Sequence, residues 1–339
     1  MSFYRSFRAR AARAGLHRPV GWLRNLGLDS TDVFLASHGR AGSTLLRFVL
    51  AEILSGIPST FDTIQRISPE VGLQINAYPI LPGGGRLIKT HEPYCRVYRR
   101  AIYLVRDVRD VILSGFARDA ATGSIDPKRR NLDDWVLAFM QGKVERWGSW
   151  QSHVASWIDS PLAARGDLLV IRFEDMREDL ESTVARCLDF LGSPAKPSVI
   201  QAAIHHNSIE KMRTKEQESK RMDKISGDGR QVNSGLIGRW RNTLSEKQLR
   251  IVDEYAGDTL AFFDYPNSNN HEVKHQTKTG DRRWDSANTR IRSAEMFCRN
   301  RLAKIPRVDL ESPVPFLADR ALRVRIEGRI ANLFCWYHY

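Results

Sequence analysis

A buried strand, a glycine loop and an amphipathic helix follow one another near the start of the chain, and this order constrains the fold most. Residues 32–36 form an apolar run that stops at His38-Gly39, and an apolar-periodic segment extends from Ser43 to Leu54. The pattern predicts a strand, a loop and a helix. Backbone N–H groups of such a loop and of the first helical turn form a concave site for an anion.

The same alternation continues further along the chain. Strands are expected at 86–89, 100–105 and 168–173, and helices at about 109–118 and at 180–191. Alternating strands and helices indicate βαβ units and a parallel sheet. We therefore predict an α/β fold of three layers, with a central parallel sheet flanked by helices.

Two internal segments have a distinct composition. Residues 131–158 contain four tryptophans and predict one or two buried helices, whose aromatic side chains serve packing rather than the stacking of nucleic-acid bases. Residues from about 214 to 234 are polar and charged, and contain glycine. This second segment predicts a mobile loop.

The two ends of the chain are basic. Residues 1–28 carry six arginines and no acidic residue, which suits a solvated basic end, and an amphipathic membrane-surface helix or a targeting segment stays an alternative. A linker-like run at 267–270 precedes a basic tail that is expected to be partly helical, at 282–303 and 317–334. We predict three parts: a basic N-terminal segment (1–28), one domain (29–266) and a C-terminal extension (267–339).

Charge and cysteine content narrow the functional classes. The formal net charge of +13 predicts attraction to polyanions, which include nucleic acid, an anionic membrane face and phosphorylated small molecules. The four cysteines lie far apart and lack metal-binding spacing, which is typical of a reduced intracellular protein without a structural metal. No apolar run approaches the ~18 residues of a membrane span.

The first loop differs from the nucleotide-binding loop of kinases and ATPases. That loop places a lysine between its last glycine and a Ser/Thr, so that the lysine reaches the β- and γ-phosphates and the hydroxyl holds Mg²⁺. Here Gly42 is followed directly by Ser43, and the cation is Arg40, two residues before the glycine. The loop thus predicts phosphate binding without the triphosphate machinery.

The stretch RAGSTL at 40–45 resembles the 5′-phosphosulfate loop of the cytosolic-type sulfotransferases, which have a P-loop-type fold and use 3′-phosphoadenosine 5′-phosphosulfate (PAPS) as donor. The resemblance implies that Arg40 contacts the leaving phosphate and that Gly42, Ser43 and Thr44 bind the 5′-phosphate. The implied donor-binding residues of this loop are Arg40, Ala41, Gly42, Ser43, Thr44 and Leu45.

A second stretch, YLVRDVRDVILS at 103–114, resembles the 3′-phosphate signature of the same family. Arg106 ends a predicted strand and Ser114 lies eight residues later on a predicted helix. An arginine fork and a serine hydroxyl placed in this way can converge on one phosphate. The alternative interpretation is a surface salt-bridge run formed by residues 106–110.

A third stretch, KTHEP at 89–93, resembles the element that carries the family's general base. The resemblance makes His91 the base that takes the proton of an acceptor hydroxyl, for which an unperturbed imidazole pKa of ~6.5 is suited near neutrality. Lys89 would stabilise negative charge on the bridging oxygen of the donor.

Further matches extend the resemblance over about residues 31–265. Phe173 begins a counterpart of the family's Tyr-Glu-Asp strand end, Ser208 begins a turn near the adenine, and Gly235 begins a late glycine motif. Asn233 and Ser234 stand where the family has Arg-Lys, so that two expected cations of the 3′-phosphate site are absent. Leu45 and Ile209 replace aromatic residues, which weakens stacking on the adenine.

These observations predict a sulfotransferase that moves a sulfuryl group from PAPS to a hydroxyl, with no metal ion and no nucleic-acid partner. The acceptor stays open among a sugar, a lipid, a phenol and a peptide, and so does the oligomeric state. The expected location is cytoplasmic, with a peripheral membrane contact left open. The alternatives are a basic polyanion- or membrane-binding protein on a degenerate nucleotide fold and, ranked lower, a P-loop kinase.

Overall fold

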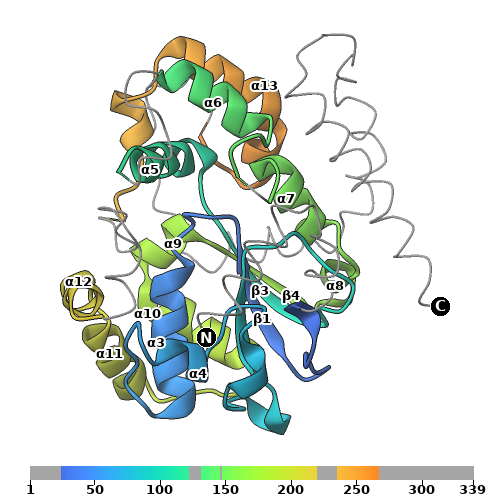
Figure 1. The fold of residues 1–339 in the computed structure, drawn as a ribbon, viewed down its shortest axis with the longest axis vertical. Coiled ribbons are helices and arrows are strands. Elements are labelled where there is room, and N and C mark those ends of the chain that lie inside the picture. Colours follow the sequence, from blue (N-terminus) through green and yellow to red (C-terminus); the bar gives the residue numbers. More distant parts are fainter. Residues whose placement is uncertain (1–23, 122–130, 146, 220–234, 267–339) are drawn as a thin grey trace, which may run out of the picture. The chain divides into compact units, whose positions relative to one another are not determined.

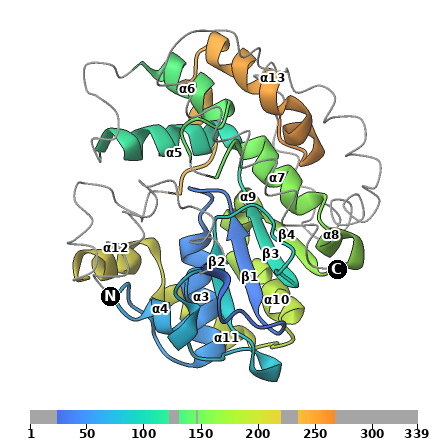
Figure 2. The same cartoon turned by 45° about the vertical axis from the view of Figure 1, so that its right-hand side comes forward.

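Four parallel strands form the central sheet of this protein (Figures 1 and 2). The structure is a computed structural model that describes residues 24–121, 131–145, 147–219 and 235–266. The strands are β1 (Val33–Ser37), β2 (Leu87–Thr90), β3 (Arg100–Val105) and β4 (Leu168–Arg172), in the order β2-β1-β3-β4. The predicted parallel sheet is confirmed.

The reversal of strand order at β1 determines where a ligand can bind. The chain runs from β1 to its neighbour β2 on one side and returns to β3 on the other side of β1. In an open parallel sheet, ligands bind outside the carboxyl ends of the strands at such a reversal. The residues that follow β1, β2 and β3 therefore meet at one edge.

Helices cover both faces of the sheet, because side chains along each strand alternate between two hydrophobic cores. In β1, Phe34 and Ala36 enter one core, whereas Val33 and Leu35 enter the other. The first core contains residues of α5 (Val108–Ala121), α6 (Leu132–Met140), α7 (Trp150–Ile158) and α13 (Glu246–Phe262). The second contains residues of α3 (Ser43–Ser55), α10 (Leu180–Phe190) and α11 (Pro197–His206).

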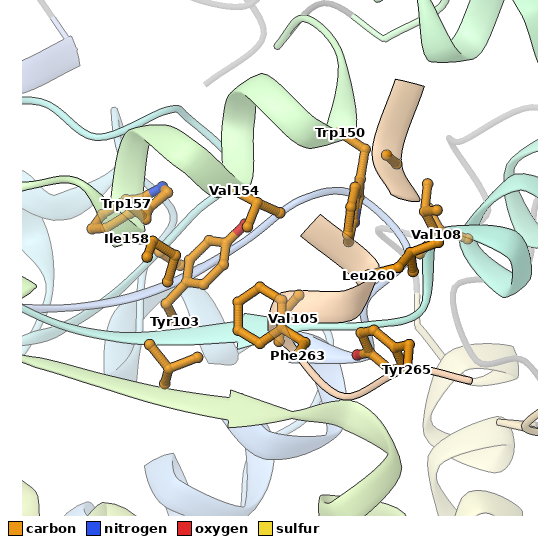
Figure 3. Close-up of a cluster of buried hydrophobic side chains, with 14 of the residues drawn as sticks. Tyr103, Val105, Val108, Trp150, Val154, Trp157, Ile158, Leu260, Phe263 and Tyr265 are labelled. Atoms are coloured by element: carbon orange, nitrogen blue, oxygen red, sulfur yellow. The ribbon is translucent and has the colours of Figure 1, made fainter. Parts of the chain in front are cut away.

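Aromatic side chains fill the first core next to β3 (Figure 3). The Tyr103 ring stacks on Trp157 with a centroid distance of 5.7 Å, and Trp150 and Trp157 are almost fully buried. Phe263 and Tyr265, which follow α13, pack into the same cluster. The tryptophan-rich segment thus forms two helices whose aromatic rings are mostly buried, as predicted.

The remaining helices and turns are short, apart from α12. They are α4 (Ile64–Ile67), α8 (Pro161–Arg165), α9 (Phe173–Glu178), α12 (Ile209–Gln217), and the 3₁₀ turns Gln74–Asn76, Pro82–Gly84 and Arg239–Asn242. Across the described residues, none of the helices has the length and apolar character needed to cross a membrane.

Two predicted boundaries were wrong. The strand expected at 168–173 ends at Arg172, and Phe173 instead begins α9, whose first turn carries Glu174 and Asp175. Acidic residues favour the start of a helix because their negative charge interacts favourably with the positive end of the helix dipole. The loop was also predicted to begin too early, at about residue 214. The Ser208 side chain caps the start of α12, and this helix continues to Gln217. Residues 220–234, 282–303 and 317–334 lie outside the described residues.

Candidate active site

The glycine loop joins β1 to α3 in a conformation that leaves the first turn of α3 open. Arg40 and Gly42 have left-handed φ values of 67° and 88°. A Cβ atom at Gly42 would lie 2.4 Å from Cε2 of Phe173, so only glycine fits. The first turn has neither a side-chain cap nor an acidic residue, and its N–H groups and dipole suit an anion.

Arg40 and Arg106, the two predicted phosphate cations, lie against each other. Arg40 Nε donates to Ser114 Oγ at 3.1 Å, and a guanidinium nitrogen of Arg106 donates to the Arg40 carbonyl at 3.2 Å. Arg106 also donates to the Leu236 carbonyl at 2.8 Å and covers the Phe173 ring at 4.2 Å. Four separately predicted segments therefore meet at one edge of the sheet.

The alternative of a surface salt-bridge run is wrong. Arg106, Asp107, Arg109 and Asp110 are all buried, with exposed fractions of at most 6%. Arg109 pairs with Asp107 at 2.8 Å and lies over the Trp240 ring at 3.7 Å. Asp110 accepts from the backbone N–H of Gly238 at 2.7 Å. These contacts attach the late glycine motif to the start of α5.

His91 follows β2 directly, and its tautomer is determined by β1. Its Nδ1 lies 2.8 Å from the Ser37 carbonyl oxygen. Because a carbonyl only accepts, Nδ1 carries the proton and Nε2 keeps its lone pair. Burial, with Lys89 close by, lowers the pKa of His91 to about 3. The ordinary imidazole pKa assumed from the sequence therefore does not hold, and His91 is neutral at physiological pH.

Lys89 lies within β2, where it pairs with Leu35 of β1 and is 6% exposed. Its Nζ is 3.7 Å from Oε1 of Glu70. Glu70 forms a parallel bridge with Lys89, which places both side chains on the same side of the backbone ladder. No sequence motif pointed to Glu70, because its position depends on a short pairing between segments far apart in the chain.

A buried histidine supports the backbone of His91. The Nε2 of His153 lies 3.1 Å from the His91 carbonyl, and its Nδ1 lies 3.0 Å from the Tyr103 hydroxyl. His153 therefore donates to His91 through Nε2 and accepts from Tyr103 through Nδ1. Burial, with His38 nearby, lowers the pKa of His153 to about 3.

Glu174 links Tyr265, which follows α13, to the segment around Arg106. One of its oxygens accepts from the Asp107 backbone N–H at 3.1 Å, and the other accepts from the Tyr265 hydroxyl at 2.8 Å. Burial, with Asp107 nearby, raises the pKa of Glu174 to about 7. Since both partners donate, the contacts suit the ionised carboxylate. Glu174 thus holds the peptide that follows Arg106.

The other predicted residues fall into three groups. Ala41 is buried in the loop and Ser43 is buried at the start of α3, whereas Thr44 and Leu45 are half-buried in the first turn of that helix. Gly235 has a left-handed φ of 63° and lies beside Arg177. The hydrogen bonds of Ser208 are local, to His205, Lys211 and Met212, and none joins it to the glycine loop within the described residues. Asn233 and Ser234 lie outside the described residues.

The buried histidines predict a loss of stability in acid. The folded-state pKa of His153 is about 3 against an ordinary value of 6.5, so the unfolded state binds the proton first as the pH falls. Its contribution is present above pH 6.5 and decreases toward pH 3, which amounts to ~2 kcal/mol between pH 6.5 and 5. Urea unfolding at pH 7 and pH 5 should show a smaller loss for His153→Gln than for the wild type. Equal losses would contradict this assignment.

Comparison with known proteins identifies the family of this chain. A family model described as the sulfotransferase domain matches residues 30–264. The chain belongs to the sulfotransferase domain family. Sulfotransferase 2A6 of Mus musculus is 24% identical over 68% of this chain and 85% of the relative. Sulfotransferase 2A1 of Rattus norvegicus is 28% identical over the same shares, 68% and 85%.

Solved structures of this kind share the fold. A retinol dehydratase in complex with androsterone and the inactive cofactor PAP gives a TM-score of 0.58 at 21% identity, over 76% of this chain and 86% of that one. A mouse sulfotransferase complexed with PAP gives 0.53 at 23% identity, over 71% and 87%. The predicted P-loop-type three-layer fold is therefore confirmed. The family match confirms the predicted enzyme class.

Proposed function

We propose that this sulfotransferase moves a sulfuryl group from PAPS to an acceptor hydroxyl, with His91 as general base. The observation that carries the donor is the convergence of Arg40 and Arg106. Among the described residues, their recorded hydrogen bonds go to neutral oxygens of Ser114, Arg40 and Leu236. Arg106 Nε is buried with no hydrogen-bond partner in the same set. A buried cation is costly unless anions compensate it, and Asp110 and Glu174, the carboxylates near Arg106, form no hydrogen bond with it within the described residues.

The chain's residues fit a donor with phosphates at both ends. The 5′ end would lie on the first turn of α3, between Gly42 and Thr44, with Arg40 beside it. Arg106 and Ser114 would hold the 3′-phosphate through charge-assisted hydrogen bonds. Burial, with Arg118 and Arg106 nearby, lowers the pKa of Arg40 to about 10, which still leaves a cation at neutral pH.

His91 and Lys89 would carry the chemistry. When bound, PAPS supplies a sulfur that bonds to the acceptor oxygen while its bond to the bridging phosphate oxygen breaks. His91 Nε2 takes the acceptor proton, since Nδ1 is engaged with Ser37. Lys89 and Arg40 balance the negative charge that collects on the leaving oxygen. An anionic donor next to Lys89 would also offset the ammonium charge that disfavours protonated His91.

Isothermal titration tests the donor assignment. The purified protein is titrated with adenosine 3′,5′-bisphosphate, with 5′-AMP and with ATP–Mg²⁺. Binding that depends on the 3′-phosphate is expected, because the proposal assigns Arg106 and Ser114 to that phosphate. Preference for ATP–Mg²⁺, or indifference to the 3′-phosphate, would count against the donor. Salt-sensitive binding of polyanions alone would favour the alternative of a degenerate, inactive fold.

Replacing Ser114 by alanine is expected to weaken the binding of adenosine 3′,5′-bisphosphate about 10-fold, because one hydrogen bond to a charged group is lost. The binding of 5′-AMP should change much less. The two affinities are measured by the same titration. If the affinities for both nucleotides fell equally, Ser114 would act in the 5′ part of the site and not at the 3′-phosphate. Its hydrogen bond from Arg40 Nε would fit that outcome.

A further inference from the structure

Charged side chains lie next to the glycine loop and Lys89, the residues that flank the proposed base. Gly39 lies between Ser37, which contacts His91, and Arg40. A Cβ atom at Gly39 would lie 3.7 Å from Oε1 of Glu145, so this carboxylate covers the loop at that point. Glu145 is paired with Arg118 at 2.9 Å.

The Arg118–Glu145 pair belongs to the same place as the donor residues. Arg118 lies one helical turn after Ser114 on α5, and side chains four residues apart share a helix face. Because Arg40 reaches Ser114, Arg118 comes next to Arg40, where burial and its charge lower the pKa of Arg40. The pair is partly accessible, with side-chain exposures of 29% for Arg118 and 13% for Glu145.

A second carboxylate, that of Glu70, lies beside Lys89, two residues before His91. The side chain of Glu70 is 42% exposed and lies between Lys89 and Arg47, at 3.7 Å and 3.4 Å. Its backbone pairing with Lys89 keeps it there. Charged groups from three separate segments therefore lie at this edge of the sheet: Glu70 beside Lys89, and Arg118 and Glu145 beside the glycine loop.

The chemistry of these groups selects among acceptors. A phenol or sterol ring packed against these charged groups would displace their water. The ring could not replace the hydrogen bonds of that water, and the desolvation of the charges would be costly. Two carboxylates would repel an anionic acceptor. The cations next to them, Lys89, Arg47 and Arg118, are already paired with these carboxylates. Neighbouring hydroxyls of one molecule can donate to carboxylates and accept from a guanidinium.

We infer that the acceptor of this enzyme is an uncharged, hydroxyl-rich molecule of the sugar or polyol class. This inference rests on the proposed function. Glu70 and Glu145 accept from hydroxyls next to the one that is sulfated, and Arg118 donates to another. These three residues determine specificity, whereas His91 takes the proton of the reacting hydroxyl and the sulfuryl group passes to its oxygen.

Matched acceptors test the inference on the full chain with PAPS. The panel consists of 4-methoxyphenol and its glycosides of glucose, galactose and mannose, so that each pair differs by the sugar. We expect kcat/KM to be at least ~10-fold higher for one or more glycosides than for the phenol. Turnover of the phenol in preference to every glycoside, or of no glycoside, would overturn the inference.

A double variant tests the specificity residues. Arg118→Leu with Glu145→Leu removes both partners of this pair, and Asp119, which also pairs with Arg118 at 2.7 Å, loses that contact. We expect kcat/KM for the preferred glycoside to fall by ~30-fold or more and that for the phenol to fall much less. The matched control is Arg165→Leu with Asp167→Leu, an exposed pair that precedes β4 at the opposite end of the sheet. Equal losses on both acceptors would overturn the role of the pair. Glu145→Gln, which keeps the shape of the side chain, serves if the double variant does not fold.

Titration with adenosine 3′,5′-bisphosphate separates the two proposals. Binding that depends on the 3′-phosphate, together with failure on the glycosides, overturns the acceptor inference and leaves the donor site standing. Absence of such binding overturns the proposed function, and the acceptor inference with it.

Discussion

Replacing His91 by alanine is expected to lower kcat about 1000-fold or more, while the affinity for adenosine 3′,5′-bisphosphate stays within about threefold. The reason is the tautomer of His91. Its protonated Nδ1 donates to the Ser37 carbonyl, so Nε2 carries the lone pair that can accept a proton. Alanine removes this base without touching Arg40 or Arg106. Single-turnover kinetics and titration of the same preparation measure the two quantities.

A histidine elsewhere on the surface supplies the control for this variant. His205 of α11 is exposed, and its replacement by alanine should leave both kcat and affinity unchanged. If His91→Ala lost binding and turnover by the same factor, His91 would be a structural residue of the loop and not the base.

The second large effect is expected for Gly42→Ala, which should weaken the binding of adenosine 3′,5′-bisphosphate at least ~100-fold. The added Cβ would lie 2.4 Å from the Phe173 ring, and φ is +88°. Either the loop or Phe173 must move, and both belong to the proposed donor site, where Arg106 lies over the Phe173 ring at 4.2 Å. Calorimetric titration measures the affinity, and thermal unfolding measures the accompanying loss of stability.

Gly56→Ala separates strain from collision. Gly56 also has a left-handed φ, +69°, but no heavy atom lies within 4 Å of its added Cβ. Its variant should lose only the ~1–2 kcal/mol of an unfavourable backbone conformation and should bind the nucleotide normally. A Gly42→Ala protein that behaves like Gly56→Ala would mean that the loop tolerates a side chain, and would contradict the tight packing described for Phe173.

Much of the fold follows from local patterns in the sequence. Apolar runs such as 100–105 predict buried strands because a strand covered on both faces needs apolar side chains at every position. Boundaries are less certain, as Phe173 illustrates: an aromatic residue extends a strand pattern, yet the acidic residues after it begin a helix. The helices α11 and α13 were not anticipated, although both begin with a local signal: Pro197 in the first turn of α11, and the capping box of Ser245 and Gln248 at α13.

The site residues divide in the same way. The order of loop, KTHEP element and arginine–serine signature predicted which segments carry the donor and the base, because residue type and spacing are local properties. The environment of each group depended on the tertiary structure. The pKa of His91 at about 3 results from burial beside Lys89, and the sequence contains no measure of that burial.

What the sequence by itself determined is therefore the alternation of strands and helices, the glycine loop without a lysine, and the identity of the charged and titratable groups. Only the tertiary structure decided which of these groups touch. Arg40 reaches Ser114 across 74 positions, and Glu70 pairs with Lys89 through a short bridge between distant segments. Such contacts depend on the packing of strands and helices that are remote in the chain, and no local pattern encodes them.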